Sequence, residues 1–486
     1  MMEAGHIIDG KEVASVAGQK FVSINPATEE PLAEVADGGA EDVDRAVKSA
    51  RRAFDEGPWL KMPPWERGRL LGRVAEIIRR RNDELAMIDA LDCGKPYKDN
   101  KYGDLPVCAR IFDYYAGVPD KVAGKVFPSE QQLYNYSIRE PYGVVAGIVP
   151  WNYPFLNSCI KLAPALAAGN ACVLKMAEQT PLSTVELGKI CLAAGIPPGV
   201  VNVVNGGPET GAALTHHTLV DKISFTGSTE VGRRILQAAA DRIVPVTLEL
   251  GGKSPSVVFA DADQDQAVAG VLFSGFFNAG QICTTGSRLL VEQSIADKFI
   301  EKVAARAATL RLGDPTKEET DLGPLVGRVQ LNRVQEYLRI GQAEGAHPHV
   351  IGTASKPSRG FFIRPVIFTG VTPGMRIAQE EVFGPVLSLL TFSDEEEAIK
   401  LANGVAYGLA ASLWTRDLGR AFRMARAIHA GMIWTNTAEY WDPSVPYGGH
   451  KQSGLGEDFG LEAYHTYTKA KSVFVNLSNS KLVWGP

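Results

Sequence analysis

Three polar side chains near glycines or turn residues are the candidates for chemistry in this chain. Cys283 lies in Asn278–Thr285 (NAGQICTT), and the glycine and small polar residues around it favour an accessible loop. A cysteine thiolate is a strong nucleophile, although a lone cysteine is more often a small core residue. Glu249 in LELGG and Asn152 in PWNY carry reactive groups too. Taken singly, Glu249 suits a surface position better than a catalytic one, and Asn152 equally suits a turn.

Neither of two common phosphate-binding motifs, the P-loop and the G-x-G-x-x-G loop, is complete in this chain. Gly251–Ser254 (GGKS) resembles the end of a P-loop, but Thr247 stands where that loop needs its first glycine. No G-x-G-x-x-G occurs in the chain. Phe225–Gly232 (FTGSTEVG) follows an apolar strand and opens a helix, so its backbone N–H groups suit a phosphate. Lys175 and Glu178 follow another strand end, where a carboxylate can bind ribose hydroxyls. Strand-end turns and a surface ion pair explain these residues equally well.

The elements around these residues alternate between strand and helix from residue 143 onward. Short, continuous apolar runs predict strands that are buried on both faces, at 143–149, 171–175, 200–204 and 223–225. Helical segments separate them, at 158–168 and at 181–194, with Gly195 as a stop. A second such stretch runs from 252 to about 445, with strands at 254–259, 287–291 and 386–392. This alternation predicts α/β units with doubly wound parallel sheets.

The flanking regions predict helices and exposed strands. Helical spacing of apolar residues predicts one helix over about 43–54 and a second over about 65–84. The first forty residues read as small strands. Two further segments, 132–138 and 472–477, alternate like exposed strands and do not fit a compact domain of their own. Edge strands of this kind often pair with another subunit.

Composition excludes several classes of function. The chain has 486 residues and a formal net charge of -5, and no basic block points to nucleic acid or an anionic membrane. We expect no secretory leader and no membrane span, because the first residues and the longest apolar run suit neither. Six scattered cysteines without a CxxC pair suggest reduced thiols and a cytoplasmic location. The eight histidines show no ligand spacing with cysteines, so we expect no metal site.

Taken together, seven motifs in order give the chain a resemblance to the aldehyde dehydrogenase superfamily over essentially its whole length. The motifs are PWN (150–152), KMAEQTP (175–181), FTGSTEVG (225–232), ELGGKSP (249–255), GQIC (280–283), EVFGP (381–385) and GGHKQSGLG (448–456). The chain departs from the family pattern at Asn205–Gly211, where the loop is one residue shorter.

The resemblance implies a fold and an assembly. It implies a Rossmann-like NAD-binding domain (1–121 and 142–251), a catalytic α/β domain (252–451) and a small β oligomerisation element (122–141 and 452–486). It also implies a homo-oligomer, either a dimer or a tetramer, in which the tail strand extends a neighbour's sheet. The cofactor would be NAD, with NADP possible. Glu178 favours NAD, because a 2′-phosphate there would meet a like charge.

Residue roles follow from the same resemblance. Cys283 would attack the aldehyde, while the Asn152 amide and the Cys283 N–H would stabilise the oxyanion. Glu249, whose pKa partial burial could raise, would activate the water that hydrolyses the thioester. The catalytic residues would be Cys283, Glu249, Asn152 and Lys175. The cofactor residues would be Trp151, Lys175, Glu178, Gly227, Ser228, Glu381 and Phe383.

The substrate pocket is implied only in outline. Family positions that line the aldehyde tunnel are Tyr153, Ile160, Phe277, Glu439, Trp441 and Tyr447. Aromatic faces near the carboxylate of Glu439 suit a cationic aldehyde, such as betaine aldehyde or an aminoaldehyde. Aromatic residues line most apolar tunnels, however, so an uncharged aromatic substrate is the alternative. Two other functions stay open: a coenzyme A-acylating relative, which Glu249 disfavours, and a non-catalytic binding or structural relative, which the three intact catalytic residues disfavour.

Overall fold

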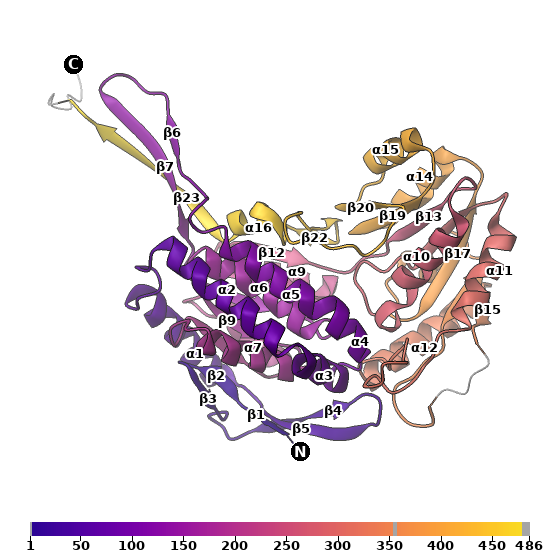
Figure 1. The fold of residues 1–486 in the computed structure, drawn as a ribbon, viewed down its shortest axis with the longest axis horizontal. Coiled ribbons are helices and arrows are strands. Elements are labelled where there is room, and N and C mark those ends of the chain that lie inside the picture. The colour runs from indigo at the N-terminus through magenta and orange to yellow at the C-terminus, as the bar shows by residue number, and fades with distance from the viewer. Residues whose placement is uncertain (1, 353–356, 479–486) are drawn as a thin grey trace.

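The protein consists of two α/β units and a projecting β arm. The computed structural model describes residues 2–352 and 357–478. The two units lie side by side, and the arm extends away from the first of them (Figure 1). No helix in the described part of the chain is long and apolar enough to cross a membrane.

The first unit is built on an eight-stranded sheet. In spatial order its strands are β22 (Gly454–Leu455), β12 (Val246–Glu249), β11 (Lys222–Thr226), β8 (Val144–Ile148), β9 (Ala171–Lys175), β10 (Val201–Val204), β2 (His6–Ile8) and β3 (Lys11–Val13). The five strands from β12 to β10 are parallel. The chain builds outward from β8 to β10 and then returns to β11 on the other side of β8. Such a reversal of strand order is where doubly wound sheets bind ligands.

Helices cover both faces of this sheet, as the alternating pattern predicts. One face packs against α2 (Pro64–Arg80), α5 (Leu105–Ala116), α6 (Pro154–Ala167) and α7 (Leu182–Ala193). The other packs against α1 (Ala40–Asp55), α8 (Pro208–His216) and α9 (Thr229–Ala240). A small sheet of β1 (Met2–Ala4), β5 (Glu30–Ala36) and β4 (Lys20–Asn25) lies beside the unit. The predicted Rossmann-like architecture is therefore confirmed.

The second unit has a seven-stranded sheet. Its order is β15 (His347–Val350), β16 (Val366–Thr369), β17 (Val386–Phe392), β14 (Arg288–Glu292), β13 (Pro255–Val258), β19 (Ala410–Trp414) and β20 (Met432–Thr435), and only β15 is antiparallel. Helices α10 (Gln264–Phe276) and α11 (Ala296–Ala307) cover one face, and α14 (Glu395–Asn403) and α15 (Leu418–Ala427) cover the other. Helices α12 (Arg328–Ala343) and α13 (Arg376–Gln379) pack beside β16. A two-stranded sheet joins β18 (Tyr407–Gly408) to β21 (His450–Lys451).

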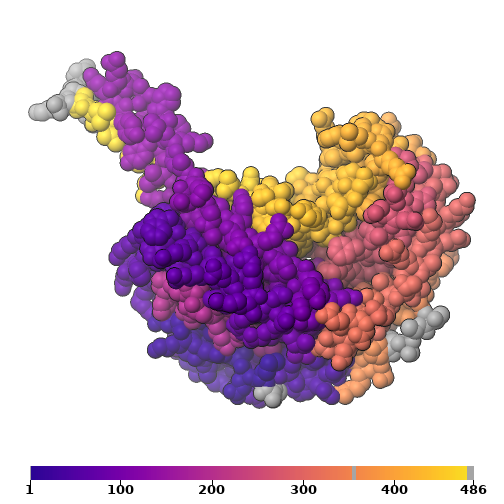
Figure 2. All heavy atoms as spheres, in the orientation of Figure 1, coloured from indigo at the N-terminus to yellow at the C-terminus, as the bar shows by residue number. Residues whose placement is uncertain are grey.

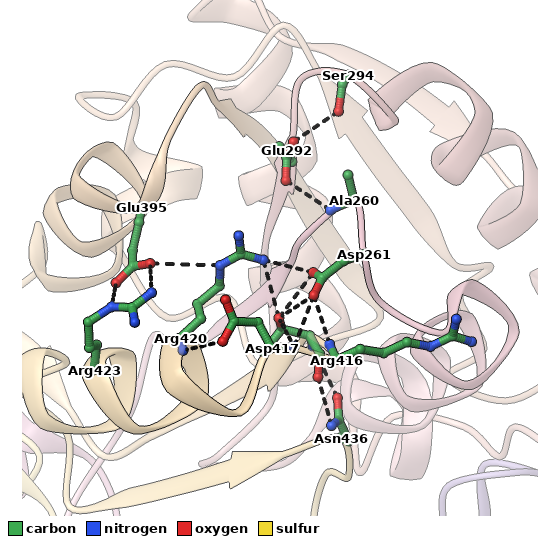
Figure 3. Close-up of polar contacts among 11 residues, drawn as sticks. Ala260, Asp261, Glu292, Ser294, Glu395, Arg416, Asp417, Arg420, Arg423 and Asn436 are labelled. Atoms are coloured by element: carbon green, nitrogen blue, oxygen red, sulfur yellow. Dashed lines mark hydrogen bonds and ion pairs between the residues drawn. The ribbon is translucent and has the colours of Figure 1, made fainter.

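A polar network closes the carboxyl edge of this second sheet (Figure 3). The carboxylate of Asp261, just after β13, accepts hydrogen bonds from the Thr415 hydroxyl and from the backbone N–H groups of Arg416 and Asp417. Arg420 adds an ion pair to Asp261 at 2.8 Å. The edge where a parallel sheet usually binds ligands is thus occupied by the protein's own charges, and the site lies at the opposite edge.

The two exposed strands predicted at 132–138 and 472–477 pair with each other. They form β7 (Leu133–Pro141) and β23 (Thr468–Asn476), which run antiparallel along their full lengths, with β6 (Lys125–Phe127) on the far side of β7. Each of the two strands therefore has a partner within the chain. The outer edges of β23 and β6 remain at the margins of this arm, which stands clear of the body in Figure 2.

One expectation about local structure needs correction. The helix expected over 65–84 ends at Arg80 because Arg81 leaves helical geometry (φ -99°, ψ 16°), and α3 (Asn82–Asp92) then begins. A π-helical segment (Asn100–Asp104) follows the short α4 (Tyr97–Asp99). Within the expected oligomerisation element, β22 pairs with β12, and α16 (Gly460–Thr466) packs on α6. The domain boundaries themselves stay predictions.

Candidate active site

A cleft lies between the two units, where the carboxyl edge of the first sheet faces the amino edge of the second. Its volume is about 980 Å³, open solvent at the mouth included. Strands β11 and β12 end at it, and the loop before β14 brings Cys283 into it. Most of the predicted site residues line this cleft: Trp151, Asn152, Tyr153, Ile160, Gly227, Ser228, Glu249, Cys283, Glu381, Phe383, Trp441 and Tyr447.

The loop that carries Cys283 has an unusual backbone. Asn278 and Ala279 adopt left-handed conformations (φ 49° and 54°) within the short 3-10 segment Phe277–Gly280. A Cβ at Gly280 would lie 2.2 Å from the carbonyl oxygen of Gly384, so only glycine fits there. The Cys283 sulfur lies 3.2 Å from the Tyr447 hydroxyl. Burial raises the pKa of the Cys283 thiol to about 12.

Asn152 faces this loop from the turn after β8. Its side-chain amide donates one hydrogen bond, 2.9 Å long, to the carbonyl oxygen of Gln281. The second amide proton is not used in that bond. The side chain of Asn278 returns a hydrogen bond to the Asn152 carbonyl at 2.9 Å. These bonds fix the amide beside the nucleophile loop, where it lines the cleft.

Glu249 ends β12 with its carboxylate buried in the cleft. The residue is 4% exposed, and its Oε2 atom has no hydrogen-bond partner among the residues that the structure describes. Burial raises the pKa of Glu249 well above its ordinary value, and the nearby carboxylate of Asp458 raises it further. The Lys161 ammonium opposes this shift and pairs with Asp458 at 2.7 Å. A buried carboxyl with a raised pKa suits proton transfer near neutral pH.

The other half of the cleft has the features of a dinucleotide site. Ser228 caps the start of α9 by accepting a hydrogen bond from Val231 N at 3.3 Å, and Gly227 and Ser228 line the cleft, so this helix N-terminus suits a phosphate. Trp151 and Phe383 meet edge to face, with ring centroids 5.2 Å apart. Glu381 accepts a hydrogen bond from Gly252 N at 3.0 Å. Burial raises the pKa of Glu381 to about 7.

Two residues that the sequence analysis missed hold this half in place. Gln330 donates from its side chain to the Phe383 carbonyl at 2.6 Å, and Arg333 donates to the Glu381 carbonyl at 2.7 Å. Both line the cleft from α12. Their spacing of three residues places them on one helix face, which was the only sequence feature that could have pointed to them. The phosphate-suited helix end, the aromatic pair and the buried carboxylate together fit a nicotinamide dinucleotide.

Lys175 and Glu178 lie outside this cleft. Lys175 is buried at the carboxyl end of β9, and its ammonium lies 3.9 Å from the Glu178 carboxylate. Burial lowers the pKa of Lys175. Glu178 lines a neighbouring groove with Gly207 and Pro208, which belong to the shortened loop and the start of α8. Glu178 therefore lines a groove that could bind the adenosine end of a dinucleotide. Lys175 does not line the cleft that holds Cys283 and Glu249.

Phe277 and Glu439 also lie outside the cleft. Glu439, with a positive φ of 54°, accepts a hydrogen bond from the Thr284 hydroxyl at 2.5 Å. Glu439 is half-buried, and burial raises its pKa to about 7. Phe277 lies under the ammonium of Lys95, which pairs with Asp104 and is 4.7 Å from the Phe277 ring centroid. Lys95 had no role in the sequence analysis.

Comparison with known proteins identifies the group to which this chain belongs. The model of the aldehyde dehydrogenase family matches residues 13–473. The chain belongs to the aldehyde dehydrogenase family. It is 43% identical to a mitochondrial benzaldehyde dehydrogenase of Antirrhinum majus, over 97% of this chain and 89% of that protein.

Solved structures agree over the whole length. The NAD+ complex of an aldehyde dehydrogenase from Bacillus cereus has a TM-score of 0.96 and 41% identity, covering 98% of this chain and 97% of that one. A betaine aldehyde dehydrogenase from Staphylococcus aureus, also with NAD+, has a TM-score of 0.95 and 37% identity, covering 99% and 96%. The protein is thus an aldehyde dehydrogenase that uses NAD(P)+.

The charges around Glu249 predict two opposite pH shifts. Turnover that depends on an ionised Glu249 increases as the pH rises through the raised pKa of this carboxyl. The Asp458→Asn variant removes a negative neighbour, lowers the pKa of Glu249 and moves the acid limb of kcat to lower pH. The Lys161→Met variant removes the opposing positive charge and moves that limb to higher pH. Steady-state rates from pH 5 to 9 measure both, and shifts in the same direction would contradict the assignment.

Proposed function

We propose that this enzyme converts its aldehyde to a carboxylic acid through a thioester on Cys283. The observation that carries the proposal is the meeting of Cys283, Asn152 and Glu249 in one cleft, beside the Glu381 and Phe383 half that fits the nicotinamide. A nucleophile, an oxyanion donor and a base within one cleft are the parts that acyl chemistry needs.

Attack by sulfur forms the first bond of the reaction. The Cys283 thiolate adds to the aldehyde carbonyl, and the carbonyl electron pair moves to oxygen. The free amide proton of Asn152 and the Cys283 N–H then donate hydrogen bonds to this oxyanion. Both are available, because the Asn152 amide uses one proton for Gln281 and the Cys283 N–H donates to no protein group among the described residues. Removing one such donor typically lowers the rate about 10²–10³-fold. The bound nicotinamide supplies the hydride acceptor for the oxidation.

Hydrolysis completes the reaction at Glu249. The carboxylate takes a proton from a water molecule, whose oxygen attacks the thioester carbonyl, and the C–S bond breaks with its electron pair returning to sulfur. The unpaired Oε2 atom of Glu249 is free to accept this proton. The Asp458–Lys161 pair lies within electrostatic reach of it. A hydrolytic base in this position disfavours transfer of the acyl group to coenzyme A.

The aldehyde side of the cleft favours an uncharged, apolar substrate. Its walls are Ile160 and the aromatic rings of Tyr153, Trp441 and Tyr447. The ring centroids of Tyr153 and Trp441 are 5.7 Å apart. The carboxylate expected to bind a cation, Glu439, is bonded to Thr284 instead. The Lys95 ammonium also lies over the Tyr153 ring at 3.8 Å. We therefore rank aromatic and aliphatic aldehydes above betaine aldehyde or an aminoaldehyde, as in the relative named a benzaldehyde dehydrogenase.

Two variants test the mechanism. Cys283→Ala should abolish reduction of NAD with benzaldehyde, hexanal, betaine aldehyde and aminobutyraldehyde. Glu249→Gln should keep one rapid turnover per active site and then slow about 10²–10⁴-fold, because only hydrolysis loses its base. Stopped-flow absorbance at the reduced-nicotinamide band measures both. Activity in Cys283→Ala would refute the nucleophile, and a kcat/KM higher for betaine aldehyde than for benzaldehyde would refute the substrate ranking.

Glu178 predicts the choice between the two cofactors. A carboxylate near the adenosine ribose repels a 2′-phosphate, so we propose that NAD is preferred. Glu178→Gln should raise kcat/KM for NADP relative to NAD by about tenfold, the effect of roughly one unfavourable charge contact. Glu209→Gln, on the exposed first turn of α8, is the matched control and should leave the ratio unchanged. An unchanged ratio in Glu178→Gln would remove Glu178 from cofactor selection.

We infer that the arm joins two copies of the chain. Phe474 on β23 is 74% exposed and Val126 on β6 is 64% exposed, which is unusual for side chains of an isolated protein. The free edge of β23 can extend a neighbour's sheet, since β20 is also an edge strand. Phe474→Glu should lower the particle mass in light scattering, whereas Val329→Glu on α12 should not. A wild-type mass near 52.3 kDa would contradict assembly.

A further inference from the structure

The nucleophile has one polar side-chain contact among the described residues, and it comes from Tyr447. The Cys283 sulfur and the Tyr447 hydroxyl are 3.2 Å apart, within the range of a hydrogen bond to sulfur. Asn152, the other polar group at this loop, directs one amide proton to the Gln281 carbonyl. The phenol is therefore the group in direct contact with the reacting atom.

The charges that face Cys283 oppose ionisation of its thiol. Burial is the largest cause of the raised pKa of Cys283, and the carboxylates of Glu439, Glu381 and Glu249 add to it. The groups that act most strongly on this pKa include no lysine, arginine or histidine, and among them the Tyr447 hydrogen bond lowers it. Many reactive cysteines depend on a neighbouring cation. This site must stabilise its thiolate by another contact.

Tyr447 is built to donate rather than to ionise. Burial raises the pKa of the Tyr447 phenol well above its ordinary value, and Cys283 and Glu249 raise it further, so the hydroxyl keeps its proton. Reciprocal backbone hydrogen bonds of 2.7 Å tie Tyr447 to Asp458. Its ring packs against Trp441 and Phe459, with centroids 5.6 and 5.9 Å away. The hydroxyl is thus held at the sulfur before any substrate arrives.

We propose that Tyr447 is a catalytic residue that donates a hydrogen bond to the Cys283 sulfur. The bond stabilises the thiolate before it attacks the carbonyl carbon. It weakens as the sulfur electron pair becomes the C–S bond. When hydrolysis breaks the C–S bond, its electron pair returns to sulfur, and the phenol again donates a hydrogen bond to the thiolate. Tyr447 keeps its proton throughout, so proton balance stays with Glu249 and water. The proposal rests on the proposed function and adds a residue to it.

The test measures the thiol directly, without cofactor or aldehyde. Alkylation of Cys283 by iodoacetamide is followed from pH 6 to 10 by peptide mass spectrometry, in the wild type and in Tyr447→Phe. Loss of one hydrogen bond to a charged sulfur should slow alkylation about tenfold at each pH of this range, because the whole range lies below the thiol pKa of about 12. Tyr115→Phe is the matched control, because it also loses a buried hydroxyl, one that donates to the Gly460 carbonyl and not to sulfur. Its profile should match the wild type.

Steady-state rates separate the remaining roles of the hydroxyl. With hexanal, which has no second polar group, Tyr447→Phe should lower kcat/KM about tenfold, in step with the alkylation rate. Unchanged alkylation would overturn the proposal, whatever the steady-state rates show. So would a loss confined to hydroxylated benzaldehydes, since the phenol would then be binding substrate. Alkylation is read without turnover, so failure of the thioester mechanism in Cys283→Ala is a distinct result.

Discussion

The close approach of backbone and side chain at Gly251 and Gly252 is the constraint on which the site depends. These two glycines link the first sheet to the second. A Cβ at Gly252 would lie 2.4 Å from the Cys283 carbonyl oxygen, and one at Gly251 would lie 2.5 Å from Glu381. The chain can therefore pass between the Cys283 loop and the Glu381 carboxylate only where it has no side chains. Glu249, two residues earlier, is placed in the cleft by the same passage.

This junction explains why the cleft combines two opposite sheet edges. The first sheet contributes its carboxyl edge, where its parallel strands and the start of α9 can bind a dinucleotide. The second contributes its amino edge, because the chain enters β13 directly from the glycines. Its carboxyl edge faces away and is filled by Asp261 and the arginines around it (Figure 3). A parallel sheet does not by itself decide which edge carries function; the connection between the sheets does.

Sequence patterns predicted the features that depend on residues close together in the chain. Continuous apolar runs predicted the buried strands, and the glycine-rich segments around Glu249 and Cys283 located residues that now line one cleft. The sequence could not predict contacts between distant positions. The Lys161–Asp458 pair joins residues 297 apart, and the Tyr447–Cys283 contact spans 164. Periodicity indicates that a residue is buried, but not which partner it meets. The hydrogen bond between Thr284 and Glu439 is a further example, since these residues are 155 positions apart.

The buried cleft sets opposite requirements for its two reactive groups. Burial raises the pKa of Glu249, which helps a base near neutral pH, and it also raises the pKa of the Cys283 thiol, which hinders a nucleophile. One low-dielectric environment cannot serve both, because desolvation penalises every anion. A cation beside the thiol would lower the pKa of the base as well. A neutral donor aimed at sulfur alone avoids this conflict, because a hydrogen bond acts over a shorter range than a charge. The Tyr447 phenol meets that requirement, and its burial among aromatic rings keeps it neutral.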